Sequence, residues 1–240
     1  MIAAFAVWSA SIAAGFTGFG FNLLAVPLLA LVFLPKDAVI IALVLGLVVS
    51  GLLAALAARR REIDLRVVLL LTAGSVPGLA LGTALFRYID GSALRIAIGA
   101  ITAGCAALFL IHRSPKPRQA RTGESLGVGL LGGALAATTG TGGPPVVAYL
   151  MVTATDGVRV RGTVLAHVAL VSLLALSAHA SNGQLSTNQL EEALKLVPAV
   201  LIGLAIGSHL FRRAPGTIYR QVANSTLLLV GVAGIVLAVH

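Results

Sequence analysis

Long runs of apolar residues, separated by short polar stretches, cover most of the chain. A helix needs about 20 mostly apolar residues to cross roughly 30 Å of hydrocarbon. Six runs meet this requirement: residues 37–58, 66–86, 94–112, 162–180, 191–211 and 218–239. The pattern therefore predicts an all-α polytopic membrane protein with six full transmembrane helices.

Two further apolar regions, 2–34 and 125–154, are interrupted by glycine-rich stretches. The first contains GFTGFG and the second TGTGGPP. Glycine and proline disfavour a helix interior, so each region predicts two shorter helices joined at a break. We expect the second helix of each pair to begin near Phe21 and near Pro144. Proline suits a first helical turn, where no backbone N–H is needed.

The chain has the pattern of a duplication. The sequence TGFG from Thr17 aligns with TGTG from Thr139 at an offset of 122, and GLALG from Gly78 aligns with GLAIG from Gly203 at an offset of 125. Two homologous halves are the simplest explanation. The predicted units are a first membrane repeat at 1–112, a cytoplasmic linker at 113–124 and a second membrane repeat at 125–240.

The distribution of lysine and arginine separates two topologies for the interrupted regions, because basic residues gather on the cytoplasmic side. If each region is one kinked span, the two sides of the membrane hold 9 and 8 basic residues. If each is a re-entrant hairpin, one side holds 13 and the other 4. We therefore expect hairpins. Each half then crosses three times, which makes the halves inverted repeats and places both termini outside the cytoplasm.

Composition agrees with a bilayer location. The chain is 58% hydrophobic and 10% charged, with a mean hydropathy of +1.00. The net charge of +9 is accounted for by cytoplasmic loops, so we expect no nucleic-acid partner. The first residues lack the basic segment of a signal peptide, and none is expected. Cys105 is the single cysteine, so no intrachain disulfide is possible.

The two breaks together form a candidate substrate site. Backbone groups at membrane depth must be satisfied by protein or by a water-filled cavity, and the helix starts after the breaks present N–H groups and a positive dipole end. These features suit an anion. Tight helix packing or kinking is the alternative explanation. The candidate substrate-binding residues are Thr17, Gly18, Gly20, Asn22, Thr138, Thr139, Gly140, Thr141, Gly142 and Pro144.

Other residues narrow the choice of solute. All eight carboxylates lie at span ends or in loops, whereas cation and proton pathways commonly use buried carboxylates. A small anionic substrate is therefore expected. His167 is a candidate proton relay or substrate contact and Asn224 a candidate cavity residue, although either side chain would also fit an interhelical hydrogen bond. The GxxxG spacing from Gly78 and from Gly203 predicts close helix packing.

The glycine-rich turns, together with the PGxxxG element from Pro77 and its counterpart after Pro198, resemble the sulfite exporter TauE/SafE family, also called the 4-toluene sulfonate uptake permease family. The resemblance covers nearly the whole chain. It implies a bacterial or archaeal inner-membrane transporter for sulfite, sulfonates or other small organic anions. The halves differ at the turns, because Asn22 in the first half stands where the second has Pro144.

The resulting hypothesis is an alternating-access carrier that holds a small sulfur-containing or organic anion between the two breaks. An anion channel and a non-transporting membrane subunit are the alternatives. The sequence contains no motif for catalysis, a metal or a cofactor, so we expect neither enzymatic activity nor a cofactor. The expected partners are the anion and the lipid bilayer.

Overall fold

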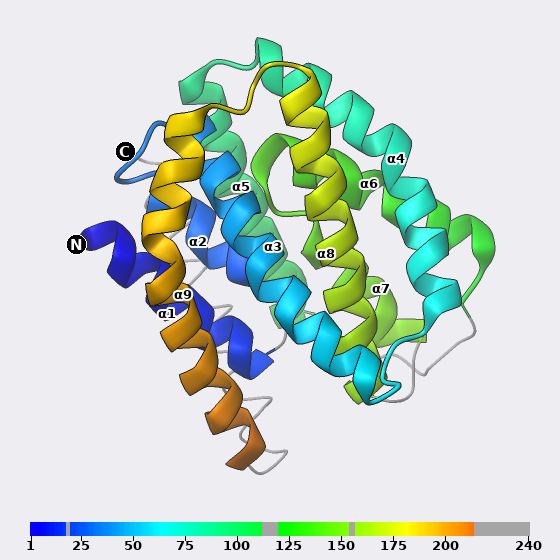
Figure 1. Ribbon diagram of the computed structural model, residues 1–240. Coiled ribbons are helices and arrows are strands. Elements are labelled where there is room, and N and C mark those ends of the chain that lie inside the picture. The colour runs from blue at the N-terminus through cyan, green and yellow to red at the C-terminus, as the bar shows by residue number, and fades with distance from the viewer. Residues whose placement is uncertain (18–19, 112–119, 154–156, 214–240) are drawn as a thin grey trace.

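A computed structural model of the chain describes residues 1–17, 20–111, 120–153 and 157–213 as helices joined by short turns (Figure 1). This part of the chain contains no strand. The helices are α1 (Ile2–Thr17), α2 (Phe21–Leu29), α3 (Pro35–Arg59), α4 (Leu65–Tyr88), α5 (Gly91–Ile111), α6 (Thr122–Thr139), α7 (Gly143–Thr153), α8 (Gly157–Ser181) and α9 (Thr187–Arg213).

Helices α3, α4, α8 and α9 are long and apolar enough to cross a membrane. They coincide with four of the six predicted spans, and α5 occupies the position of a fifth. The span predicted at 218–239, which includes Asn224, lies outside the described residues. The prediction of an all-helical, polytopic membrane protein is confirmed for the part of the chain that the structure describes.

Polar side chains mark where several helices begin. The carboxylate of Asp64 accepts a hydrogen bond from Val67 N, 3.1 Å away, at the start of α4. At the start of α5, Asp90 accepts from Ala93 N at 2.6 Å and from the Ser92 hydroxyl at 2.8 Å. These hydrogen bonds, with the backbone one first, hold the pKa of the Asp90 carboxyl below its ordinary value. Each side chain satisfies an amide that has no partner within its own helix.

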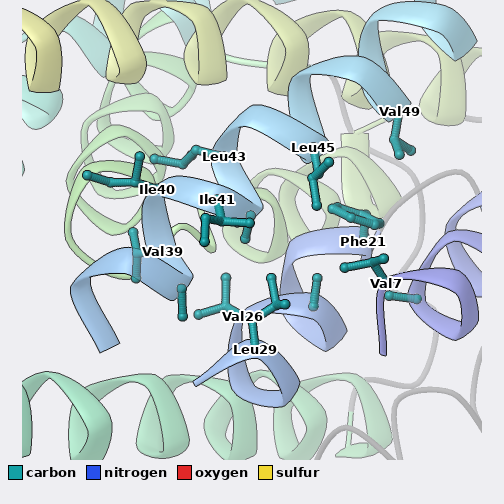
Figure 2. Close-up of a cluster of buried hydrophobic side chains, with 14 of the residues drawn as sticks. Val7, Phe21, Val26, Leu29, Val39, Ile40, Ile41, Leu43, Leu45 and Val49 are labelled. Carbon is teal, nitrogen blue, oxygen red and sulfur yellow. The ribbon is translucent and has the colours of Figure 1, made fainter. Parts of the chain in front are cut away.

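The main hydrophobic core is centred on α3 and includes buried side chains of α1, α2, α8 and α9. Figure 2 shows Phe21, Val26 and Leu29 of α2 lying opposite side chains of α3, among them Ile41 and Leu45. All five side chains are 5% exposed or less. Because α3 is buried along much of its length, this core fixes the short helix α2 in place beside it.

Glycines allow α4 and α6 to pack with their backbones in contact. A side-chain carbon at Gly78 would overlap the carbonyl oxygen of Leu130, and one at Gly82 would lie 2.5 Å from that of Ala134. This confirms the close packing that the GxxxG spacing predicts for α4. Only glycine allows such an approach without moving one of the helices.

Helices α1 and α9 pack in the same way and lie side by side in Figure 1. A side-chain carbon at Gly203 would overlap the carbonyl oxygen of Trp8, and one at Gly207 would overlap that of Ile12. The close-packing prediction for the second GxxxG pair is therefore confirmed as well.

The two helix pairs correspond residue by residue. An offset of 125 carries Gly78 to Gly203, and an offset of 122 carries Trp8 to Leu130. The contact between Gly78 and Leu130 is thus the counterpart of the contact between Gly203 and Trp8. Each pair joins a helix of the predicted first repeat to a helix of the predicted second repeat, called the two halves below, so these two stretches of chain are interlocked. Helices α3 and α8 lie between the two pairs (Figure 1).

Candidate functional site

The backbone turns sharply at corresponding places in the two halves. Helix α1 ends at Thr17 and α2 begins at Phe21, after Gly20 with a φ of 89°. Helix α6 ends at Thr139 and α7 begins at Gly143, after Gly140 with a φ of 72°. This left-handed conformation is unfavourable for any residue with a side chain but open to glycine. The observed helix starts lie at or next to the positions expected from sequence.

A cavity of about 60 Å³ lies where these turns meet α3 and α8. A single water needs only about 10–15 Å³ by the same measure, so the cavity has room for a small ion. Seven of the predicted site residues line it. They are Gly20, Asn22, Gly140, Thr141, Gly142, Pro144 and His167.

Two other predicted residues lie beside the cavity without lining it. Thr138 is 8% exposed and donates a hydrogen bond to the carbonyl of Ala134, one turn back in α6. Thr139 is 1% exposed, and its hydroxyl lies 2.8 Å from that of Thr141. In this structure Thr139 is placed to orient Thr141. The predicted site residue Gly18 and the side chain of Thr17 lie outside the described part of the chain.

Asn22 links the two halves across the cavity. Its side-chain Nδ2 donates to the carbonyl oxygen of Gly140 at 2.8 Å. The other amide atom, Oδ1, is buried and has no hydrogen-bond partner among the described residues. A side-chain carbon at Gly46 of α3 would overlap this oxygen. Glycine at position 46 therefore makes room for the Asn22 amide.

His167 is the one histidine among the residues that line the described cavity. It projects from α8, is 1% exposed, and its Nδ1 lies 3.2 Å from the hydroxyl of Thr72 in α4. The interhelical hydrogen bond that was the alternative for His167 is thus present in the structure. Because the same ring also borders the cavity, the two interpretations are compatible.

The lining of the cavity follows the duplication. Most lining residues fall into pairs related by an offset of 122: Ala14 and Ala136, Gly20 and Gly142, Phe21 and Gly143, Asn22 and Pro144, Leu43 and Leu165, Gly46 and Val168, Val49 and Val171, and Ser50 and Ser172. Sequence reasoning missed the members on α3 and α8. Extending the offset of 122 beyond the glycine turns would have found the two serines, which lie at matching positions in the two repeats.

The cavity offers hydrogen-bond donors without an opposing negative charge. None of its described lining residues is an aspartate, glutamate, lysine or arginine. Its polar groups are the Asn22 amide, the His167 ring, the hydroxyls of Thr141, Ser50 and Ser172, and the backbone at the starts of α2 and α7. Helix N-termini present N–H groups and the positive end of the helix dipole. The arrangement is chemically suited to a small anion.

Comparison with known proteins agrees with this chemistry. The family model described as sulfite exporter TauE/SafE matches residues 2–234. The chain belongs to the sulfite exporter TauE/SafE family. The resemblance noted from sequence is thereby confirmed, and the family is one of membrane transporters.

Among curated proteins, the chain is similar to the probable sulfite/organosulfonate exporter TauE of Cupriavidus necator. The two are 23% identical over 218 residues, which cover 90% of this chain and 85% of the relative. No solved structure matches the chain significantly.

Proposed function

We propose that this protein is a secondary transporter that carries sulfite or small organic sulfonates across the membrane by alternating access. Membership of the TauE/SafE family and the name of the Cupriavidus relative support this substrate class. The observation that carries the proposal is the cavity without charged side chains that two helix starts border.

The anion is held between the turns of the two halves. The first turns of α2 and α7 border the cavity from opposite repeats, and the N–H groups of a first helical turn have no partner within their helix. The amide of Asn22 adds a side-chain donor. Thr139 supports Thr141 through their hydroxyl contact. A sulfite or sulfonate group has three oxygens that accept hydrogen bonds, so several donors converging from different directions match its shape.

The directions of neighbouring helices support a re-entrant hairpin in the second half. Gly78 and Gly82 of α4 lie along Leu130 and Ala134 of α6, so these two helices run parallel. Helix α8 also runs parallel to α4, since Thr163 contacts the start of α4 and His167 contacts its middle. Helices α6 and α8 therefore begin on the same side of the membrane, and the segment α6–α7 enters and leaves on that side.

The same argument holds in the first half and supports inversion. Helix α1 runs parallel to α9, because Trp8 and Ile12 lie along Gly203 and Gly207. Helices α3 and α9 begin together, where the Gln189 amide donates to Asp37 at 2.6 Å. The α1–α2 segment therefore returns to the side from which it entered. That side is opposite to the one where α4, α6 and α8 begin.

Transport by purified protein in liposomes tests the proposal. We expect saturable uptake of radiolabelled sulfite. We also expect unlabelled sulfite inside the liposomes to accelerate this uptake, because a carrier that returns with bound solute exchanges internal for external sulfite. Sulfoacetate should compete and potassium should not. Large unitary currents without counterflow would identify an anion channel and overturn the carrier mechanism. Absence of sulfur-anion flux, with protein that remains folded, would overturn the proposed substrate.

A further inference from the structure

Two carbonyl oxygens occupy equivalent positions just before the two turns. Gly15 and Ala137 are related by the offset of 122, and each lies two residues before the end of its helix, α1 or α6. Carbonyls in the last turn of a helix have no partner within that helix. Something outside each helix must satisfy them.

Arg161 binds the first of these carbonyls. Its Nη2 donates to the carbonyl oxygen of Gly15 at 3.2 Å, from the first turns of α8. A cation at a helix C-terminus also interacts favourably with the negative end of the helix dipole. Arg161 therefore ties α8 to the end of α1, immediately ahead of the first turn.

His179 binds the second carbonyl from the other end of α8. Its Nε2 lies 3.0 Å from the carbonyl oxygen of Ala137, and its Nδ1 lies 2.6 Å from Gln184 Oε1. The ring is fully buried and lies edge-on to Phe86, with 4.7 Å between centroids. His179 thus ties α8 to the end of α6.

The two contacts lie at opposite ends of the cavity. Arg161 and His179 are 18 residues apart on α8, which is about 27 Å along a helix. The cavity-lining part of α8, from Val164 to Ser172, lies between them. The equivalent helix of the other half, α3, carries Val39 and Ala57 at these positions. Neither can donate a side-chain hydrogen bond, so the paired contacts are confined to α8.

We propose that Arg161 and His179 are positioning residues that close the two ends of the cavity by holding α1 and α6 against α8. Loss of the Arg161 contact releases the end of α1 from α8, while Gly15 keeps its packing against α9, and opens the cavity on the side where α8 begins. Loss of the His179 contact frees the end of α6 and opens it on the opposite side. This inference rests on the proposed function only in identifying the cavity as the transport site.

Side-specific labelling of a cavity thiol tests the proposal without any substrate. The reporter is Ser50→Cys on α3, in a Cys105→Ala background, with a membrane-impermeant maleimide applied to right-side-out or inverted vesicles. We expect Arg161→Met to raise labelling about tenfold from the side where α8 begins and His179→Leu to raise it about tenfold from the other side. Arg161→Lys, which keeps a donor, should restore slow labelling.

Matched controls on α8 separate gating from general loosening. Arg159→Met removes an exposed cation two residues from Arg161, and Ser177→Ala removes an exposed hydroxyl near His179. Both should label as slowly as the parent. Labelling that rises equally from both sides in either test variant, or that rises in neither, would overturn the proposal. The labelling assay does not depend on transport. Its result can therefore be interpreted even if the protein does not transport sulfite.

Discussion

The interfaces between the halves and the cavity that they enclose differ in how far they keep the duplication. At the interfaces the repeat is conserved down to single contacts, since Gly78 meets Leu130 as Gly203 meets Trp8. In the cavity most lining positions are still paired and several pairs are identical, but the polar residue in the first turn of α2 has no polar counterpart in α7. Asn22 has Pro144 as its partner by the offset of 122.

This difference shows that the helix interfaces and the cavity place different requirements on the sequence. Backbone contact between helices needs glycine in both halves, because any side chain would push the helices apart. A small anion has no such need for symmetry. One half can supply an amide and the other a helix start preceded by Thr141, so the two halves can contact the ligand through different groups.

We expect the largest effect on folding at the interface glycines, where the two halves match most closely. Gly78→Leu and Gly203→Leu each place a side chain against a backbone carbonyl that cannot turn away. Overpacking commonly costs about 1–3 kcal/mol even when side chains can adjust, so we expect a loss of most folded protein. Size-exclusion chromatography in detergent measures the folded fraction.

Gly104→Leu is the matched control, because a Cβ at this exposed position of α5 lies within 4 Å of no atom in the described part of the chain. It should elute like the parent. A normal elution profile for both interface variants would show that close backbone packing is not needed in either half.

An intermediate effect is expected at the polar position that the repeat does not share. Asn22→Leu removes a donor from the cavity and the hydrogen bond to Gly140, and we expect sulfite to bind at least tenfold more weakly, about 1.4 kcal/mol. Pro144→Ala should change the Kd by less than threefold. Thr139→Val should fall between them, since Thr139 acts through Thr141.

Isothermal titration calorimetry of the purified variants measures these Kd values. Each variant must also keep the parent's elution profile in size-exclusion chromatography. Equal weakening by Asn22→Leu and Pro144→Ala would mean that the two halves contact the anion alike. That result would contradict the asymmetry of the site.

The smallest effect is expected from the serines that the repeat has retained. Ser50→Ala and Ser172→Ala remove matching hydroxyls from opposite sides of the cavity. The Ser50 hydroxyl donates its one proton to the carbonyl of Gly46 at 2.6 Å, so it has no proton left to donate to an anion. We expect about a twofold rise in Kd for each variant. A large effect from one serine alone would mean that the anion lies closer to the half that carries this serine.

The sequence predicted the helix starts, the apolar spans and the glycine contacts, because these follow from local rules. Glycine before Phe21 permits a sharp turn, and Pro144 suits a first helical turn. The contact of Asn22 with Gly140 joins residues of different halves, so no local sequence pattern predicts it. The same is true of His167 with Thr72.

Thr139 illustrates a second reason. Its position next to the turn suggested direct contact with the ligand, but its hydroxyl is buried against Thr141. Which face of a helix meets a cavity depends on the packing of distant helices, and a single sequence does not specify that packing.

The central claim is that two inverted halves meet at a shared cavity, and cysteine labelling of three positions tests it most directly. Gly123→Cys and Gly157→Cys flank the α6–α7 segment at exposed sites where a Cβ lies within 4 Å of no described atom, and Ser181→Cys lies at the far end of α8. In a Cys105→Ala background, an impermeant maleimide should label Gly123→Cys and Gly157→Cys from one side and Ser181→Cys from the other. Labelling of Gly123→Cys and Gly157→Cys from opposite sides would contradict the account.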